Sequence, residues 1–273
     1  MSIKDCSSAL GGGLGHIHLG QLPATRKWKT VADLIERGSA IEAIASASAI
    51  AAERDLARAA NDPVFVEAVR LLALIPQAAK QEDFGRALLA IGIDVAVNPS
   101  LIDLMMATTA ALDRFANREG QRSDFGELSA RALSDSLAAA IGPRLPVLFA
   151  PNSADLQVEA ARLAKSEAFS NLARHFFGRL VSETLQSWLS RKLSANVGQD
   201  RAFSGAKERA AFDAALGQYC SEATQIIKVF AGGWYGKTLF RDGTITSERA
   251  AAFGAIAFKK INEELRRKSS SDE

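Results

Sequence analysis

The feature that most constrains this chain is a run of apolar residues at helical spacing between residues 169 and 193. Its apolar members recur every three or four positions and share one face of a helix: Phe169, Leu172, Phe176, Phe177, Leu180, Leu185, Trp188, Leu189 and Leu193. Polar side chains such as Arg174, Arg179, Glu183, Gln186 and Arg191 face the other way. A helix with one apolar face must bury that face against other elements, so we expect this aromatic stripe to be core.

The composition favours helices over strands in the rest of the chain. An apolar fraction of 48% and a charged fraction of 23% are typical of a folded globular protein. Alanine, leucine and arginine are abundant, and these residues lose little side-chain entropy in a helix. A large sheet would need more β-branched and aromatic residues than the chain provides. We therefore predict an all-α fold built from one or more multi-helix bundles.

Several capping residues indicate where these helices begin. Asp62 followed by Pro63 combines a capping side chain with proline at the first helical position. Similar signals predict helices that begin near residues 100, 123, 153 and 246. The segment 238–246 is the exception, because Asp242 and Gly243 suit a two-residue turn and favour one short β-hairpin between two helices.

Glycine and proline divide the chain into three expected parts. Residues 1–29 hold five glycines and a basic patch around Trp28, which predicts a flexible Gly-rich arm. The stretch 142–153 holds three of the seven prolines and indicates a boundary. We expect one helical bundle over residues 30–142 and a second over residues 153–268.

The inventory of reactive residues argues against several classes of protein. Two cysteines, Cys6 and Cys220, are too few for a disulfide framework or a cysteine-rich zinc site. The three histidines, His16, His18 and His175, have no partners that would complete a metal site or a catalytic triad. We therefore expect no metal, no cofactor and no catalytic residues, and lean against an enzyme.

The distribution of apolar residues favours a cytoplasmic protein. No secretion signal precedes the glycines of the N-terminal segment. The longest apolar stretches, 87–97 and 101–112, fall short of the roughly 18–20 residues needed to cross a bilayer. No stable membrane insertion is expected.

The segment 231–238, AGGWYGKT, resembles a degenerate phosphate-binding loop. In such a loop Lys237 would contact the outer phosphates and Thr238 would bind magnesium. The residues that follow contain no apolar strand ending in an acidic residue to hold magnesium and no parallel sheet to carry one, and such a site needs both. We prefer to interpret Gly232 and Gly233 as the end of a helix.

One cluster of aromatic and basic residues remains as a candidate contact site. It comprises an expected loop at 231–241 and the last helix, and its proposed partner- or nucleic-acid-binding residues are Trp234, Tyr235, Lys237, Phe240, Arg241, Lys259, Lys260, Arg266 and Arg267. Aromatics interleaved with cations suit a protein interface or stacking on nucleic-acid bases. The alternative is that the aromatics pack into the bundle and the cations are solvated.

These observations support four hypotheses about function. The first is a non-enzymatic helical subunit or adaptor of a larger cytosolic assembly. The second is a nucleic-acid-binding protein, because residues 171–273 carry 16 Lys and Arg against 11 Asp and Glu. The third is a nucleotide-dependent enzyme that uses segment 231–238, and the fourth is a membrane-active helical protein.

Overall fold

The fold is a packed array of α-helices. The computed structural model describes residues 22–146, 151–199 and 201–271. Over these residues the chain forms eleven α-helices, one 3-10 turn and no β-strand, which confirms the predicted all-α class. The elements are α1 (Arg26–Glu36), α2 (Ile41–Ala59), α3 (Pro63–Ala78), α4 (Phe84–Ala90), α5 (Leu101–Glu119), α6 (Asp124–Ile141), η1 (Gly142–Arg144), α7 (Ser153–Arg162), α8 (Ser166–Ala195), α9 (Ala206–Ala223), α10 (Gln225–Asp242) and α11 (Ser247–Ser271).

Side-chain caps explain why several of these helices begin where they do. Oδ1 of Asp62 accepts hydrogen bonds from the backbone N–H groups of Val64 and Phe65 at the start of α3. Ser100 and Ser123 cap α5 and α6 in the same way. Each cap satisfies backbone donors that have no partner within the helix. The helix starts predicted at residues 62, 100 and 123 are confirmed.

Two later helices also begin close to their predicted positions. The cap of α7 is Asn152, one residue before the expected position, and its side chain accepts from the backbone N–H of Asp155 at 3.0 Å. At α11, Oγ1 of Thr246 accepts from the backbone N–H of Arg249 at 3.3 Å. Local capping chemistry therefore locates both starts to within one residue.

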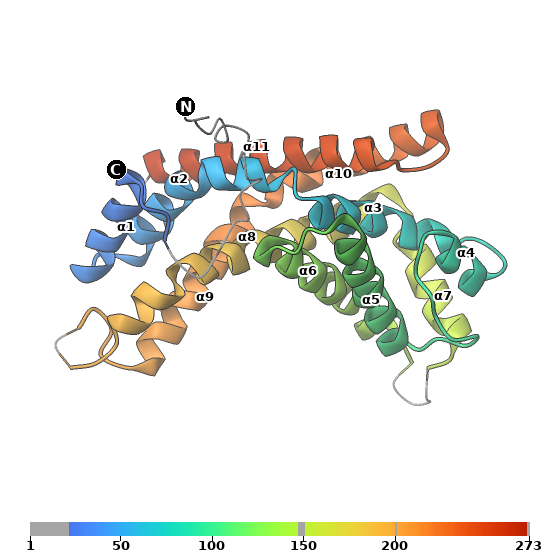
Figure 1. The fold of residues 1–273 in the computed structure, drawn as a ribbon, viewed down its shortest axis with the longest axis horizontal. Helices are drawn as coiled ribbons and strands as arrows, with labels where there is room; N and C mark the ends of the chain where they lie inside the picture. The colour runs from blue at the N-terminus through green and yellow to red at the C-terminus, as the bar shows by residue number, and fades with distance from the viewer. Residues whose placement is uncertain (1–21, 147–150, 200, 272–273) are drawn as a thin grey trace, which may run out of the picture.

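The helices on either side of the Pro-rich segment 142–153 pack against one another. Figure 1 shows α11 running alongside α2 and α3, while α8 passes beneath them toward α9. In addition, α8 contacts α6, α9 and α10. The parts expected to form separate bundles, 30–142 and 153–268, thus contribute to a single hydrophobic core.

A cluster of phenylalanine rings lies at the centre of this core. The ring of Phe65 in α3 lies 5.6 Å from that of Phe125 in α6 and 5.2 Å from that of Phe258 in α11, measured between centroids. Phe176 and Phe177 of α8 lie 6.4 and 6.1 Å from the same ring. Four helices from both halves of the chain therefore meet at Phe65.

The predicted flexible arm is wrong at its C-terminal end. Residues 26–29 form the first turn of α1, which Thr25 caps by accepting from the backbone N–H of Trp28. Trp28 is 1% exposed, and its ring packs edge-on against Trp188 of α8 at 5.3 Å. Residues 1–21 of the predicted arm, with His16 and His18, lie outside the described residues.

The predicted β-hairpin is also wrong. Residues 238–242 continue α10, and the helix ends only at Gly243, whose φ of 71° places it in the left-handed region. A helix commonly ends on such a residue, because glycine adopts this conformation without steric cost. Asp242 and Gly243 therefore mark a helix C-terminus, not a turn between strands. None of the helices in the described part of the chain is long and apolar enough to cross a membrane.

Candidate functional site

The predicted contact loop at 231–241 is part of helix α10. Its two glycines, Gly232 and Gly233, lie in the middle of the helix and do not end it. A Cβ atom added to Gly232 would lie 2.5 Å from the carbonyl oxygen of Ser166 and 2.6 Å from Oγ of Ser170. Glycine at this position therefore allows α10 to approach α8 closely.

The same geometry makes the phosphate-loop interpretation of segment 231–238 wrong. A phosphate-binding loop wraps free backbone N–H groups around the phosphates, and in an α-helix these groups bond to carbonyls four residues earlier. Thr238, the expected magnesium ligand, is only 3% exposed within the fold.

Two of the predicted contact residues pack against aromatic rings of neighbouring helices, and one of them, Tyr235, is in the interior. The ring of Tyr235 stacks on that of Phe169 at 4.0 Å, and the partly buried Trp234 stacks on Phe253 at 4.1 Å. Burial raises the pKa of Tyr235 to about 12, although a hydrogen bond from Gln77 opposes the shift. Tyr235 therefore anchors α10 to the core and is not available to a partner.

Three others lie on the surface of α10. Lys237, Phe240 and Arg241 are exposed, and Phe240 is 95% exposed. Nε of Arg241 donates to Asp242 at 2.8 Å, and Asp242 also accepts from Nε of Arg249 at 2.8 Å. Lys237 and Phe240 are therefore the members of this group best placed for an outside contact.

The four predicted residues of α11 do not join them at one site. Arg266 pairs with Glu53 of α2, and Arg267 pairs with Glu264 at 2.6 Å. Nζ of Lys260 lies 5.7 Å from the ring centroid of Phe230, and Lys259 is exposed. Arg249 lies near the start of α11, beside Asp242 of α10. At the usual rise per residue, Arg266 lies about 25 Å from Arg249 along the axis of α11 and is therefore far from Arg241.

The exposed residues of α10 form a strip along one side of the helix. We call Val229, Gly233, Lys237 and Phe240 the α10 strip. Val229 is 79% exposed, and a Cβ atom on Gly233 would meet nothing within 4 Å. At 3.6 residues per turn, Val229, Gly233 and Phe240 point within about 40° of one another, with Lys237 beside them.

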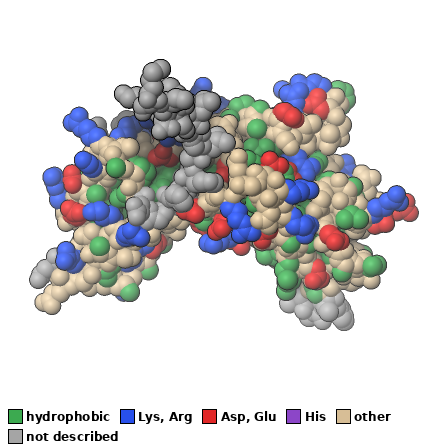
Figure 2. Space-filling view, in the orientation of Figure 1, with side chains coloured by type: hydrophobic (Ala, Val, Ile, Leu, Met, Phe, Trp, Pro, Cys, Tyr) green, Lys and Arg blue, Asp and Glu red, His purple; other side chains and the backbone are tan. Residues whose placement is uncertain are grey.

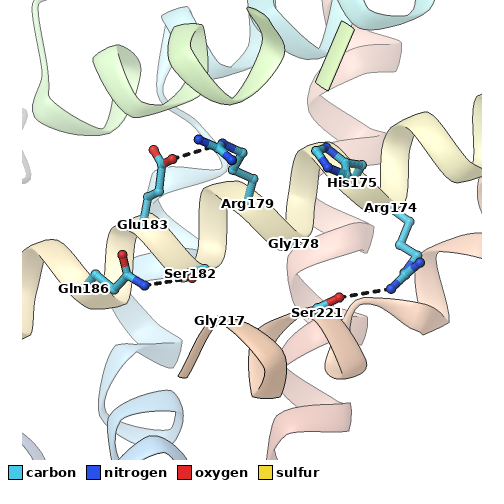
Figure 3. A pocket seen from close by; sticks show the side chains of 9 residues that line it. All are labelled: Arg174, His175, Gly178, Arg179, Ser182, Glu183, Gln186, Gly217 and Ser221. Carbon is cyan, nitrogen blue, oxygen red and sulfur yellow. Dashed lines mark hydrogen bonds and ion pairs between the residues drawn. The ribbon is translucent and has the colours of Figure 1, made fainter. Parts of the chain in front are cut away.

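A second candidate site is a polar pocket between α8 and α9, with a volume of about 370 Å³ (Figure 3). Nine residues line it: Arg174, His175, Gly178, Arg179, Ser182, Glu183, Gln186, Gly217 and Ser221. Seven of them come from α8 and two from α9. Small residues allow the two helices to approach closely, since a Cβ atom on Gly178 would lie 3.0 Å from Oγ1 of Thr224. The long side chains of α8 extend from this close contact and surround the pocket.

Arg174, at the α9 side of the pocket, is a cation that pairs with no carboxylate among the described residues. Its Nη2 donates to Oγ of Ser221 at 3.0 Å. Its Nε is buried and has no hydrogen-bond acceptor in the described part of the chain. Buried donors are nearly always paired, so this unsatisfied group is a candidate for ligand recognition.

Arg179 and Glu183 form an ion-pair network on the α6 side. Arg179 lies 2.6 Å from Asp135 of α6 and 3.1 Å from Oε1 of Glu183. Desolvation raises the pKa of Glu183 above its ordinary value, against the opposing charges of Arg179 and Arg131. Oε2 of Glu183 is buried and accepts no hydrogen bond from the described residues.

His175 lies at the rim beside this network. Oγ of Ser136 donates its proton to the carbonyl of Ala132 at 2.6 Å, so it accepts from Nδ1 of His175 at 3.1 Å. In the neutral ring Nε2 is then the free acceptor. Desolvation lowers the pKa of His175 below 6.5, the positive charges of Arg179 and Arg174 lower it further, and Asp135 opposes them. The neutral form of the ring is therefore favoured near pH 7.

The sequence does not reveal this pocket, because Arg174, Arg179, Glu183 and Gln186 lie on the polar face of an amphipathic helix, which is usually solvated. The available signal was the run of small or polar residues, Gly178, Ser182 and Gln186, at i, i+4 spacing along that face. Gly217 and Ser221 repeat the pattern on α9, but only the fold shows that the two runs face each other. In the described part of the chain no group of three or more His, Cys, Asp or Glu residues is placed to bind a metal.

Comparison with known proteins gives no relative. No protein-family model, no curated protein and no solved structure matches this chain.

Proposed function

We propose that this protein is a non-enzymatic subunit or adaptor of a cytosolic assembly, which binds a partner protein through the α10 strip. The observation that supports this proposal is the exposure of Phe240, at 95%, in line with Val229, at 79%, on the outer side of α10. Burial of one such side chain at an interface contributes about 1.5–3 kcal/mol. Two exposed apolar side chains in line on one helix favour recognition in a groove.

The strip also suggests the chemistry of the partner. Val229 and Phe240 require an apolar groove, and Gly233 allows the partner to approach the helix backbone closely. Lys237 would face the rim of that groove, where an acidic residue would complement its charge. We therefore expect an apolar groove with at least one carboxylate at its edge.

A site-specific photo-crosslinking experiment tests this proposal. In cells that contain the natural partners, p-benzoylphenylalanine in place of Phe240 should give a discrete adduct that is larger than the chain. The Val229→Ser and Lys237→Glu substitutions should each abolish the adduct. The matched control is Val97→Ser, which removes a valine that is 93% exposed in the α4–α5 connection and should leave the adduct intact.

Two results would contradict the proposal. The first is an equal yield of adducts when p-benzoylphenylalanine replaces Val97 and when it replaces Phe240, because such labelling reports only exposure. The second is an adduct of twice the chain mass formed by the purified protein alone, because the strip would then bind a second copy.

Nucleic-acid binding is the less well supported alternative. Arg241, Arg266 and Arg267 already pair with carboxylates, which leaves Lys237 and Lys259 as the more available cations of the predicted set. On the face shown in Figure 2, Lys and Arg side chains lie interspersed with Asp and Glu side chains. Binding to DNA or RNA that weakens steeply with added salt would favour this alternative.

A further inference from the structure

We propose that the pocket between α8 and α9 binds a small phosphate ester that carries hydroxyl groups, such as a sugar phosphate. Arg174 and Ser221 would bind the phosphate, and Glu183 and Ser182 would bind the hydroxyl groups. This site is separate from the α10 strip, so the inference does not depend on the proposed partner.

Arg174 provides the strongest argument for an anionic ligand. Its single hydrogen bond to Ser221 leaves Nη1 with no acceptor among the described residues, and its buried Nε is also unpaired. A guanidinium with several free N–H groups binds phosphate through paired hydrogen bonds. Ser221 accepts from Arg174, so its own hydroxyl proton is available to a phosphate oxygen.

His175, next to Arg174 along α8, would face the phosphate from the α6 side of the pocket. Its Nδ1 is held by Ser136, and its Nε2 has no hydrogen-bond partner among the described residues. An incoming phosphate offsets the positive field of Arg174 and Arg179 that now opposes protonation of the ring. Binding should therefore be coupled to uptake of a proton by His175, while Asp135 on α6 favours the same charged form.

The other end of the pocket suits hydroxyl groups. Oε2 of Glu183 is a buried acceptor without a donor, and a ligand hydroxyl would supply one. Oγ of Ser182 accepts from Nε2 of Gln186 at 3.4 Å, which leaves the Ser182 proton for a ligand oxygen. Arg174 and Glu183 are about 13 Å apart along the helix axis, so an elongated molecule fits better than phosphate alone.

The lining also argues for a sugar over a nucleobase. Apart from the imidazole of His175 at the rim, none of the nine lining residues has an aromatic or aliphatic side chain. Bases are usually recognised by stacking on such side chains, whereas hydroxyl groups need only hydrogen-bond partners. A volume of about 370 Å³ lies within the usual range for small-molecule pockets.

Isothermal titration of the purified protein with four probes tests the inference. We expect glucose 6-phosphate to bind saturably, and glucose, inorganic phosphate and AMP to bind at least tenfold more weakly. Arg174→Gln and Glu183→Gln should each weaken the binding of glucose 6-phosphate at least tenfold. Arg191→Gln removes an exposed cation of the same helix outside the pocket and should leave binding unchanged.

The pH dependence provides a second readout. His175→Gln should weaken the binding of glucose 6-phosphate more at pH 6 than at pH 7.5, because the second pKa of the ester, about 6, affects wild type and variant alike. Circular dichroism at each pH shows whether every variant remains folded, and Arg174→Lys replaces Arg174→Gln if the latter unfolds.

The inference is overturned if glucose 6-phosphate shows no saturable binding in the millimolar range, or if the Arg174 and Arg191 variants bind equally. Inorganic phosphate or AMP that binds as tightly as glucose 6-phosphate also overturns it, since the hydroxyl end would then play no role.

Discussion

Gln77 of α3 and Tyr235 of α10 are joined by a hydrogen bond of 2.6 Å, in which Nε2 of Gln77 donates to the phenol oxygen. The same phenol donates to the carbonyl oxygen of Ala73 at 3.2 Å. These bonds connect residues more than 150 positions apart in the chain, and the ring between them is 1% exposed. Tyr235 therefore positions α10 against α3 through both packing and polar contacts.

Removal of the phenol hydroxyl should destabilise the fold modestly. We expect Tyr235→Phe to lower the free energy of unfolding by about 1–2 kcal/mol, because the ring still packs but both hydrogen bonds are lost. Urea denaturation measures the change. A double-mutant cycle with Gln77→Ala should show coupling between the two side chains, and strictly additive effects would contradict the hydrogen bond.

Adjacent glycines of α10 should respond oppositely to alanine. Gly232→Ala places a methyl group 2.5 Å from a carbonyl oxygen of α8 and should cost about 1–3 kcal/mol of stability. Gly233→Ala adds a methyl group in open space and should stabilise the helix by about 0.5–1 kcal/mol. Thermal unfolding of both variants tests the register of α10. Equal effects would show that the two glycines do not differ in environment.

Trp28 should be essential to the fold, although the sequence places it beside a glycine-rich segment. Trp28→Ala removes a buried ring from its contact with Trp188 and should cost about 3–5 kcal/mol of stability. The control Lys29→Ala alters an exposed neighbour in the same turn and should have little effect. Chemical denaturation of the two variants distinguishes a packed helix from a loose arm, in which both changes would be nearly neutral.

The contribution of His175 to stability should decrease in acid. Its folded-state pKa lies below the ordinary 6.5. Below pH 6.5 the unfolded chain therefore binds the proton more readily than the folded chain. The contribution of His175 to the free energy of unfolding is complete above pH 6.5 and is lost as the pH falls through the folded-state pKa. The difference in stability between wild type and His175→Gln should shrink between pH 7.5 and pH 5.5, measured in phosphate-free buffer. A constant or growing difference would contradict the assigned direction.

Local signals in the sequence were sufficient to predict the fold class and most helix starts. Asp62, Ser100 and Ser123 each cap a helix through backbone groups within three residues, so the information lies in a short segment. The start of α1 was missed because the glycines of residues 1–29 favour a flexible arm, and only the burial of Trp28 shows that the helix begins within it.

The errors arose where contacts distant in sequence decide the structure. Gly232 looks like a helix terminator, but its role is to accommodate Ser166 and Ser170 of another helix. Tyr235 looked available because nothing near it in sequence reveals Phe169 or Gln77 as partners. The pocket was missed for the same reason, since Ser221 lies beside Arg174 only when α9 packs against α8.

The position of Phe65 has a consequence for how this protein unfolds. Its ring contacts rings from α6, α8 and α11, so the hydrophobic centre requires helices that lie before and after segment 147–150. A chain cut in that segment would leave two fragments, each with part of an incomplete aromatic cluster. Neither fragment could reach the native state alone, and mixing them should restore it by complementation. Intact, the chain should therefore unfold as one cooperative unit.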